Sequence, residues 1–335
     1  MRRYSRGMTT SRIRVLATGG TIAGSGGSAF GSGYRPGQIA AADMLQAARA
    51  LGIEADLDHV EIANIGSQDI GWREWNLLHA EVLRAQGDPA ICGIIITHGT
   101  DTAEETAFLL DLTLDAGKPA VLVGAMRPAD AVGSDGMRNF ANAVQVASDP
   151  AARDRGVLVV MGDAVFAARD VRKAATSSVD AFKGFPRGPL ARVTPGTLDW
   201  FGPAGRVGSE ARFAWPRQLP RVAILIAGAG MDAMPVEALL GIGAQGIVLA
   251  GMGQGNAPAS VLDALECAAR AGVPVVRSSR VDEGLVDRNV EVDDDGRGFV
   301  AARALGPAKS RILLMLLIAS GITEPAAIQA AFDER

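Results

Sequence analysis

The chain has 335 residues, of which 48% are hydrophobic and 21% are charged, and its formal net charge is −4. This composition is typical of a globular protein and excludes a disordered chain. The Lys and Arg residues are scattered in ones and twos, which argues against a nucleic-acid partner because such a partner needs a basic patch.

The first 20 residues, MRRYSRGMTTSRIRVLATGG, are basic but contain no apolar segment of the kind that secretory signals carry. The sequence also contains no run of about 18 apolar residues that would span a membrane. We therefore expect a soluble protein with no membrane partner. It is expected to act in the cytoplasm, or in the periplasm if the true N-terminus carries a signal that is not present here.

Short apolar, β-branched runs alternate with helical patterns along the chain. Runs of this kind predict strands that are buried on both faces, as in a parallel sheet. The predicted strands are residues 14–18, 59–63, 93–97, 120–124 and 156–161, and then 221–227, 246–250 and 273–278. The alternation predicts an α/β fold with ligands at the carboxyl ends of strands.

Helical periodicity marks residues 71–86, 139–148 and 259–271, and a Thr102–Glu105 capping box predicts a further helix through Leu114. Six residues of the first helix fall on one predicted face and are expected to lie in the core: Trp72, Trp75, Leu78, His79, Val82 and Leu83. Cys92 and Cys267 are interpreted as small buried hydrophobes without a disulfide. The three histidines, His59, His79 and His98, lack the spacing of zinc ligands.

Residues 194–220 interrupt this rhythm with four prolines, Pro195, Pro203, Pro216 and Pro220. Such a stretch predicts a connection between domains. We expect an N-terminal α/β catalytic domain at residues 1–200, a linker at 201–219 and a smaller C-terminal α/β domain at 220–335.

The richest polar sequences directly follow predicted strands. ATGGTIAG (residues 17–24) suits a small polar substrate, or else a tight or phosphate-binding turn, although it does not match the dinucleotide or P-loop patterns. THGTDT (residues 97–102) offers helix N-terminal N–H groups to an anion or oxyanion, while its Asp101 has helix capping as the alternative role. His98 in that stretch is expected to be structural, because no serine elbow accompanies it.

Two further stretches have both a plain and a functional interpretation. Lys173 is either a surface lysine or, if it reaches Asp101, a group that exchanges protons near neutral pH. In NIGSQD (residues 64–69), Ser67 and Gln68 either hold a carboxylate and an ammonium or form a polar turn.

Together and in this order, these stretches resemble the bacterial type II L-asparaginases. The similarity also includes GAMRPADAVGSDGMRNFANAV, GVLVVMGDAVFAARDVRKA, VVRSSRV and EVDD, and it covers residues 13–332. The resemblance implies a flavodoxin-like N-terminal domain with a parallel sheet, no metal or organic cofactor, and a homotetramer built as a dimer of intimate dimers.

The resemblance also implies a role for each matching residue. The catalytic residues would be Thr21 as nucleophile, the loop residue Tyr34, and Thr100, Asp101 and Lys173. The substrate-binding residues would be Ser67, Gln68, Asp101 and Ala125, together with Asn256 and Glu291, which reach a neighbouring subunit's site. The implied reaction is hydrolysis of L-asparagine to L-aspartate and ammonia through a covalent ester, which divides a difficult amide cleavage into two easier steps.

Two departures from the family pattern are visible. Exported members often carry a disulfide whose positions match Asp88 and Ala116 here, so that bridge cannot form. Residues 24–33 would form a flexible lid, in which Phe30 and Gly31 lie where members vary.

Because members of the family vary in the lid, the sequence does not settle the preference between asparagine and glutamine. We expect turnover of glutamine to be the weaker. The alternatives are a glutaminase-asparaginase that uses both amides comparably and a non-catalytic small-molecule binder. The amidase subunit of a tRNA-dependent amidotransferase is disfavoured, because an extra N-terminal domain and a basic face are missing.

Overall fold

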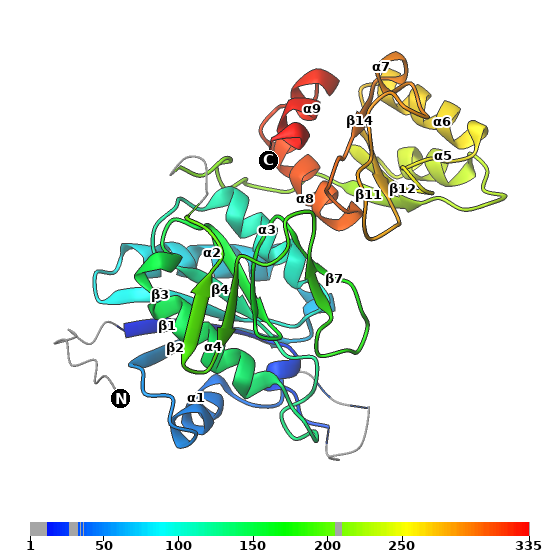
Figure 1. The fold of residues 1–335 in the computed structure, drawn as a ribbon. Coiled ribbons are helices and arrows are strands. Elements are labelled where there is room, and N and C mark those ends of the chain that lie inside the picture. The colour runs from blue at the N-terminus through cyan, green and yellow to red at the C-terminus, as the bar shows by residue number, and fades with distance from the viewer. Residues whose placement is uncertain (1–11, 27–32, 34, 36, 205–209, 335) are drawn as a thin grey trace. The chain divides into compact units, whose positions relative to one another are not determined.

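The computed structural model describes residues 12–26, 33, 35, 37–204 and 210–334. The chain divides into two compact units, the first made of Met1–Gly184 and Gly188–Ala211 and the second of Phe185–Arg187 and Arg212–Arg335. Figure 1 shows the elements of both. The expected α/β class is confirmed, because both units combine sheets with covering helices.

An eight-stranded sheet with the order β10-β9-β6-β5-β4-β3-β1-β2 forms the centre of the first unit. Its strands are β1 (Arg12–Gly19), β2 (Leu57–Ile65), β3 (Ile91–Thr97), β4 (Ala120–Val123), β5 (Val157–Met161), β6 (Ala164–Ala167), β9 (Ala191–Thr194) and β10 (Thr197–Trp200). A separate ribbon pairs β7 (Val171–Lys173) with β8 (Phe182–Gly184). The remaining elements of this unit are α1 (Ala41–Ala50), α2 (Trp72–Gly87), α3 (Ala103–Thr113) and α4 (Gly136–Ser148), with short 3-10 turns η1 (Thr21–Ala23), η2 (Ser67–Asp69) and η3 (Pro150–Ala152).

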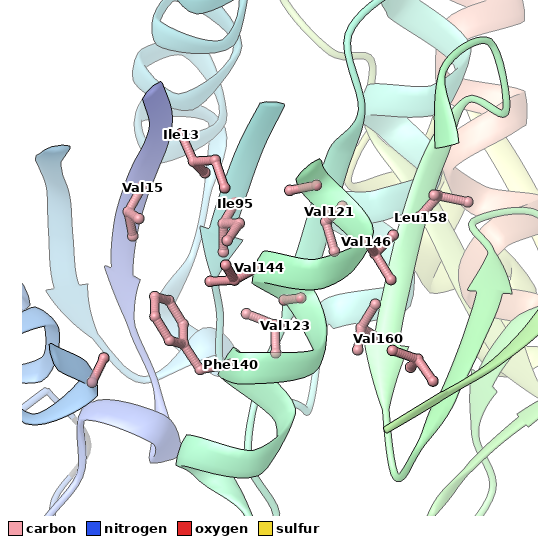
Figure 2. Packing of buried hydrophobic residues seen from close by; sticks show 14 of the residues in the cluster. Ile13, Val15, Ile95, Val121, Val123, Phe140, Val144, Val146, Leu158 and Val160 are labelled. Atoms are coloured by element: carbon pink, nitrogen blue, oxygen red, sulfur yellow. The ribbon is translucent and has the colours of Figure 1, made fainter. Parts of the chain in front are cut away.

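Both faces of this sheet are covered, which explains why its strands are apolar at consecutive positions. Ile13, Val15 and Ile95 face α1 and α4 in one buried cluster, whereas the neighbouring Leu16 and Ile96 face α2 and α3 in another. Figure 2 shows the first cluster, with Phe140, Val144 and Val146 of α4 directed at the strands.

The expected parallel sheet is present, and antiparallel strands extend it at one edge. Strands β2, β1, β3, β4 and β5 are parallel, but β6, β9 and β10 extend the sheet in antiparallel pairs. The β9–β10 hairpin also places regular structure at residues 197–200, inside the stretch expected to be a connection. The strands are only four residues long, so the glycine and proline between them dominated the sequence signal.

The second unit contains a four-stranded parallel sheet with the order β11-β12-β13-β14. Its elements are β11 (Val222–Ile226), α5 (Met234–Gly241), β12 (Gly246–Gly251), α6 (Ala259–Arg270), β13 (Val275–Ser279), α7 (Asp294–Arg297), β14 (Phe299–Ala301), α8 (Pro307–Ala319) and α9 (Pro325–Asp333). One buried cluster joins Val236 of α5 and Leu265 of α6 to Ile247 and Leu249 of β12. Among the described residues, no helix is long and apolar enough to cross a membrane.

Several smaller predictions are settled by side-chain exposure. Trp75 and His79 of α2 are buried as expected, and burial lowers the His79 pKa. Leu83 was placed wrongly in the core, because 48% of it is exposed. Cys267 is likewise exposed and Cys92 only half-buried, and both are free thiols.

Candidate functional site

The ends of β1 and β3 lie next to each other at the point where the strand order changes direction. The chain leaves β1 toward β2 on one side of it, whereas β3 pairs with β1 on the other side. In open α/β sheets, ligands bind at the carboxyl ends of strands beside such a switch point. Here the Thr18 hydroxyl donates to the Thr97 carbonyl at 2.9 Å, which joins the two strand ends directly.

Glycines allow the backbones at these strand ends to touch. A Cβ on Gly20 would lie 2.3 Å from the Gly99 nitrogen, and one on Gly19 would lie 2.6 Å from the Ile65 nitrogen. Gly20 also has φ +83, a conformation that L side chains rarely adopt. The Gly20 N–H donates to the Ile65 carbonyl at 3.0 Å. The glycine pair of ATGGTIAG is therefore required for close packing of three loops.

Ser67, in the loop after β2, is bonded to the start of α3. Its hydroxyl accepts from the Asp101 N–H at 3.2 Å, and its carbonyl accepts from the Thr102 hydroxyl at 2.8 Å. The expected capping box is thus wrong in its first half, since the Thr102 side chain caps nothing in α3. The hydroxyl instead fastens the Ser67 loop to the helix start.

Lys173 lies at the end of β7 and contacts two residues of THGTDT. Its ammonium donates to the Thr100 hydroxyl at 2.9 Å and to Asp101 Oδ1 at 2.6 Å. The Lys173 side chain is 17% exposed and the Asp101 side chain 59% exposed. The structure therefore shows Lys173 reaching Asp101, which was the condition for its functional interpretation, and adds a contact with Thr100.

Glu104 is a contributor that the motifs did not indicate. Its carboxylate accepts from the Lys173 backbone N–H at 3.2 Å, so the first turn of α3 holds the strand that carries the lysine. The sequence places Glu104 within the Thr102–Glu105 motif, but only the fold reveals that β7 passes beside it. No sequence signal connects residues 104 and 173, because they are 69 positions apart.

Thr21 opens the 3-10 turn η1 immediately after the glycine pair and is only 4% exposed. The contact of Gly20 with Gly99 places this turn beside the Thr100–Asp101 segment. Ala125 is fully buried close to the same turn, because a Cβ on Gly136 would lie 3.3 Å from Ile22 and 3.5 Å from Ala125.

The other expected site residues have different surroundings. Gln68 is exposed, and its amide donates to Asp69 at 3.5 Å. Asn256 and Glu291 lie in the second unit, where the Asn256 amide donates to Glu291 Oε2 at 2.9 Å. Tyr34 lies outside the described residues, as do Phe30 and Gly31 of the expected lid.

His98 lies within THGTDT and is fully buried. Its Nδ1 lies 2.7 Å from the Gly99 carbonyl, and burial lowers its pKa to about 4. The ring is therefore neutral near pH 7 and donates from Nδ1. Among the described residues, Nε2 has no hydrogen-bond partner, and no group of three His, Cys, Asp or Glu side chains is arranged to hold a metal ion.

Comparison with protein families places this chain in a known group. The family model described as "Asparaginase, N-terminal" matches residues 12–205, and "Glutaminase/Asparaginase C-terminal domain" matches residues 221–332. L-asparaginase 2 of Escherichia coli K12 is 43% identical over 96% of this chain and 92% of its own length. The chain belongs to the type II L-asparaginase family.

Other members of the asparaginase family show comparable coverage. A probable periplasmic L-asparaginase of Haemophilus influenzae is 43% identical over 96% of this chain and 92% of its own length. A glutaminase-asparaginase of Pseudomonas fluorescens biotype A is 38% identical over 92% of this chain and 86% of its own length. The resemblance inferred from the motifs is thereby confirmed across nearly the whole chain.

Proposed function

We propose that this protein hydrolyses the side-chain amide of L-asparagine, releasing L-aspartate and ammonia. The observation that carries the proposal is the Lys173 ammonium, which lies within hydrogen-bond distance of both Thr100 and Asp101 beside the Thr21 turn. The E. coli relative is named L-asparaginase 2 and the H. influenzae relative a probable L-asparaginase, and both names support the same activity.

The first chemical step forms an ester on Thr21. The Thr21 hydroxyl attacks the amide carbon, and its proton passes to a relay formed by Tyr34 or by Thr100 with Lys173. The negative charge that develops on the amide oxygen is stabilised by the backbone N–H of Thr100, and a donor of this kind contributes about 2.7–4 kcal/mol in other enzymes. The relay then protonates the departing nitrogen, which leaves as ammonia.

The second step regenerates the hydroxyl. A water molecule attacks the ester carbon and loses a proton to the same relay, which returns that proton to the Thr21 oxygen as the C–O bond to Thr21 breaks. The products are L-aspartate and free enzyme. Water adds one oxygen and two hydrogens in all, so the substrate amide becomes a carboxylic acid and ammonia, which exchange one proton to give carboxylate and ammonium, and the balance requires no oxidant or reductant.

The substrate's charged ends suit the groups around the cluster. Asp101 supplies an exposed carboxylate for the α-ammonium, and Ser67 and Gln68 supply neutral hydrogen-bonding groups for the α-carboxylate. Ala125 is proposed as a further substrate contact. Asn256 and Glu291 are proposed to complete the pocket of a neighbouring subunit in a homotetramer. A molar-mass measurement by light scattering tests the tetrameric state.

Two further proposals concern organisation and compartment. We place the catalytic domain at residues 1–200, the linker at 201–219 and the second domain at 220–335, which predicts that limited proteolysis cuts first within 201–219. We also propose a cytoplasmic location, because Asp88 and Ala116 stand where exported members form a disulfide. Detection of the native protein in a periplasmic fraction would reverse that proposal.

Steady-state ammonia release from asparagine and glutamine tests the activity and the preference together. We expect asparagine to be favoured, by roughly 10–200-fold, because one methylene changes binding by about 1–3 kcal/mol. Comparable kcat/KM values would instead assign a glutaminase-asparaginase, which is the name that the P. fluorescens relative carries. Binding of asparagine without ammonia release would leave only the non-catalytic binder.

A further inference from the structure

A fully buried ion pair in the second unit has no part in the proposed chemistry. Arg277 of β13 is 1% exposed, and Asp294 at the start of α7 is 0% exposed. The guanidinium binds the carboxylate through two parallel bonds, from Nε to Oδ1 and from Nη2 to Oδ2, both 2.7 Å long. We call these two residues the buried clamp.

The buried clamp is also bonded to the loops around it. Arg277 donates from Nη1 to the Gln254 carbonyl at 2.5 Å and from Nη2 to the Asp287 carbonyl at 3.0 Å. Asp294 Oδ2 accepts from the Asn289 N–H at 2.9 Å. One pair of side chains thus fixes the backbone after β12 to the backbone that leads into α7.

These two backbone segments carry the Asn256–Glu291 pair. Asn256 follows Gln254 by two residues, and Glu291 follows Asn289 by two residues. Gly255, which lies between Gln254 and Asn256, has φ +85, and a Cβ there would lie 3.1 Å from Arg277 Nη1. The turn is closed further by hydrogen bonds in both directions between Met252 and Asn256. The guanidinium is therefore packed directly beneath the turn that presents Asn256.

Stability alone does not account for such a pair. Replacing a buried ion pair by apolar residues of similar volume is often neutral or stabilising, because both charges lose their hydration on burial. Its fixed fork geometry instead specifies where the bonded carbonyls lie. The role that fits the observed bonds is to fix the positions of the two loops relative to each other.

We propose that Arg277 and Asp294 are positioning residues, which hold Asn256 and Glu291 in the arrangement that binds substrate. The inference rests on the proposed function, in which Asn256 and Glu291 complete an asparagine pocket. It adds to that function a fully buried ion pair that acts only through substrate binding.

The test replaces the clamp by Arg277→Met with Asp294→Leu in the full-length protein, together with the single Arg277→Lys variant. We expect KM for asparagine to rise about tenfold with kcat little changed, because an interaction that holds the substrate equally in the ground and transition states affects KM alone. Gln329→Met is the matched control: Gln329 is also buried in the second unit and bonds both the N–H and the carbonyl of Ala301. This control substitution is expected to lower the unfolding temperature without raising KM.

A double-mutant cycle separates positioning from general damage. When Asn256→Ala is added to the clamp variant, the two effects on KM are expected to be non-additive, since both act through one interaction with the substrate. Additive effects, or an unchanged KM in a folded clamp variant, would overturn the proposal. If the variant with both clamp residues replaced does not fold, the same measurements are made on Arg277→Lys, because lysine retains the positive charge and lacks the forked guanidinium.

Hydrogen exchange keeps this inference distinct from the proposed function. The clamp variants, but not Gln329→Met, are expected to exchange amide hydrogens faster at residues 254–256 and 289–291. Should Asn256→Ala leave KM unchanged while exchange still accelerates, the proposed role of Asn256 fails and the clamp's hold on the loops stands. Unchanged exchange in a folded clamp variant would refute the clamp itself.

Discussion

Lys173–Asp101 and Arg277–Asp294 are both contacts between a cation and a carboxylate, but their surroundings differ sharply. The Asp101 side chain is 59% exposed, whereas Arg277 and Asp294 are at most 1% exposed. Lys173 donates one bond to the Thr100 hydroxyl, whereas Arg277 donates its remaining bonds to backbone carbonyls. We call Lys173–Asp101 the open pair and Arg277–Asp294 the closed pair. The open pair is arranged to meet a ligand, and the closed pair is arranged to hold loops.

The largest expected effect is the loss of turnover when Lys173 is replaced by Met. A positioned proton-transfer group contributes about 10²–10⁴-fold, so kcat is expected to fall by that factor while the fold persists. Steady-state ammonia release checks the rate, and circular dichroism checks the fold. A normal kcat in Lys173→Met would show that the Lys173–Asp101 pair has no catalytic role and is structural, as the Arg277–Asp294 pair is.

The second effect is on stability, at the closed pair. Arg277→Ala leaves a buried carboxylate without its partner and is expected to cost about 3–5 kcal/mol of unfolding free energy. Urea denaturation measures this. The apolar double variant Arg277→Met with Asp294→Leu is expected to recover most of the loss, and a failure to recover would indicate that the ion pair is itself a major source of stability.

The third effect is a pH dependence centred on His98. Its pKa falls to about 4 on folding from an ordinary value of 6.5, so above pH 6.5 it contributes no pH dependence. As the pH falls from 6.5 toward 4, the unfolded chain binds a proton that the folded chain refuses, and stability drops by about 3 kcal/mol. Urea denaturation at pH 7 and pH 4.5 is expected to show a smaller drop for His98→Gln, and equal drops would exclude His98 as the source.

The smallest effect is the stability change for Asp101→Asn. Because Asp101 is largely exposed, its ion pair with Lys173 is expected to contribute less than about 1 kcal/mol. Urea denaturation should therefore barely distinguish this variant from the wild type, although ammonia release is expected to fall. A loss of several kcal/mol would mean that the open pair is also architectural.

Local sequence predicted what local physics controls. Strands buried on both faces left apolar runs, and glycines marked the turns where backbones touch, so β1, β3 and the ATGGTIAG turn were predicted close to their observed bounds. The short β9–β10 hairpin was missed because each of its strands has only four residues, few of them apolar, and because Pro195 and Gly196 separate the two strands. Exposure of Cys267 and Leu83 was also missed, because helical periodicity does not reveal which flank of a helix remains open to solvent.

Contacts between distant residues needed the fold. The motifs raised a pairing of Lys173 with Asp101 only as a condition, and only the resemblance to a family assigned Thr100, Asp101 and Lys173 to one site before the 2.6 Å and 2.9 Å contacts were seen. The Thr102 hydroxyl was assigned to its own helix, whereas it binds Ser67, 35 residues earlier. The Arg277–Asp294 clamp had no sequence signal at all, since an Arg and an Asp are ordinarily surface residues.

The central claim is that Thr21 is the nucleophile of the site built at the ends of β1 and β3. The most direct measurement is kcat for asparagine in Thr21→Val, with Thr21→Ser as the variant that restores a hydroxyl. We predict that Thr21→Val folds and assembles but loses nearly all ammonia release, whereas Thr21→Ser retains measurable turnover. A folded Thr21→Val enzyme with the wild-type rate would contradict the account.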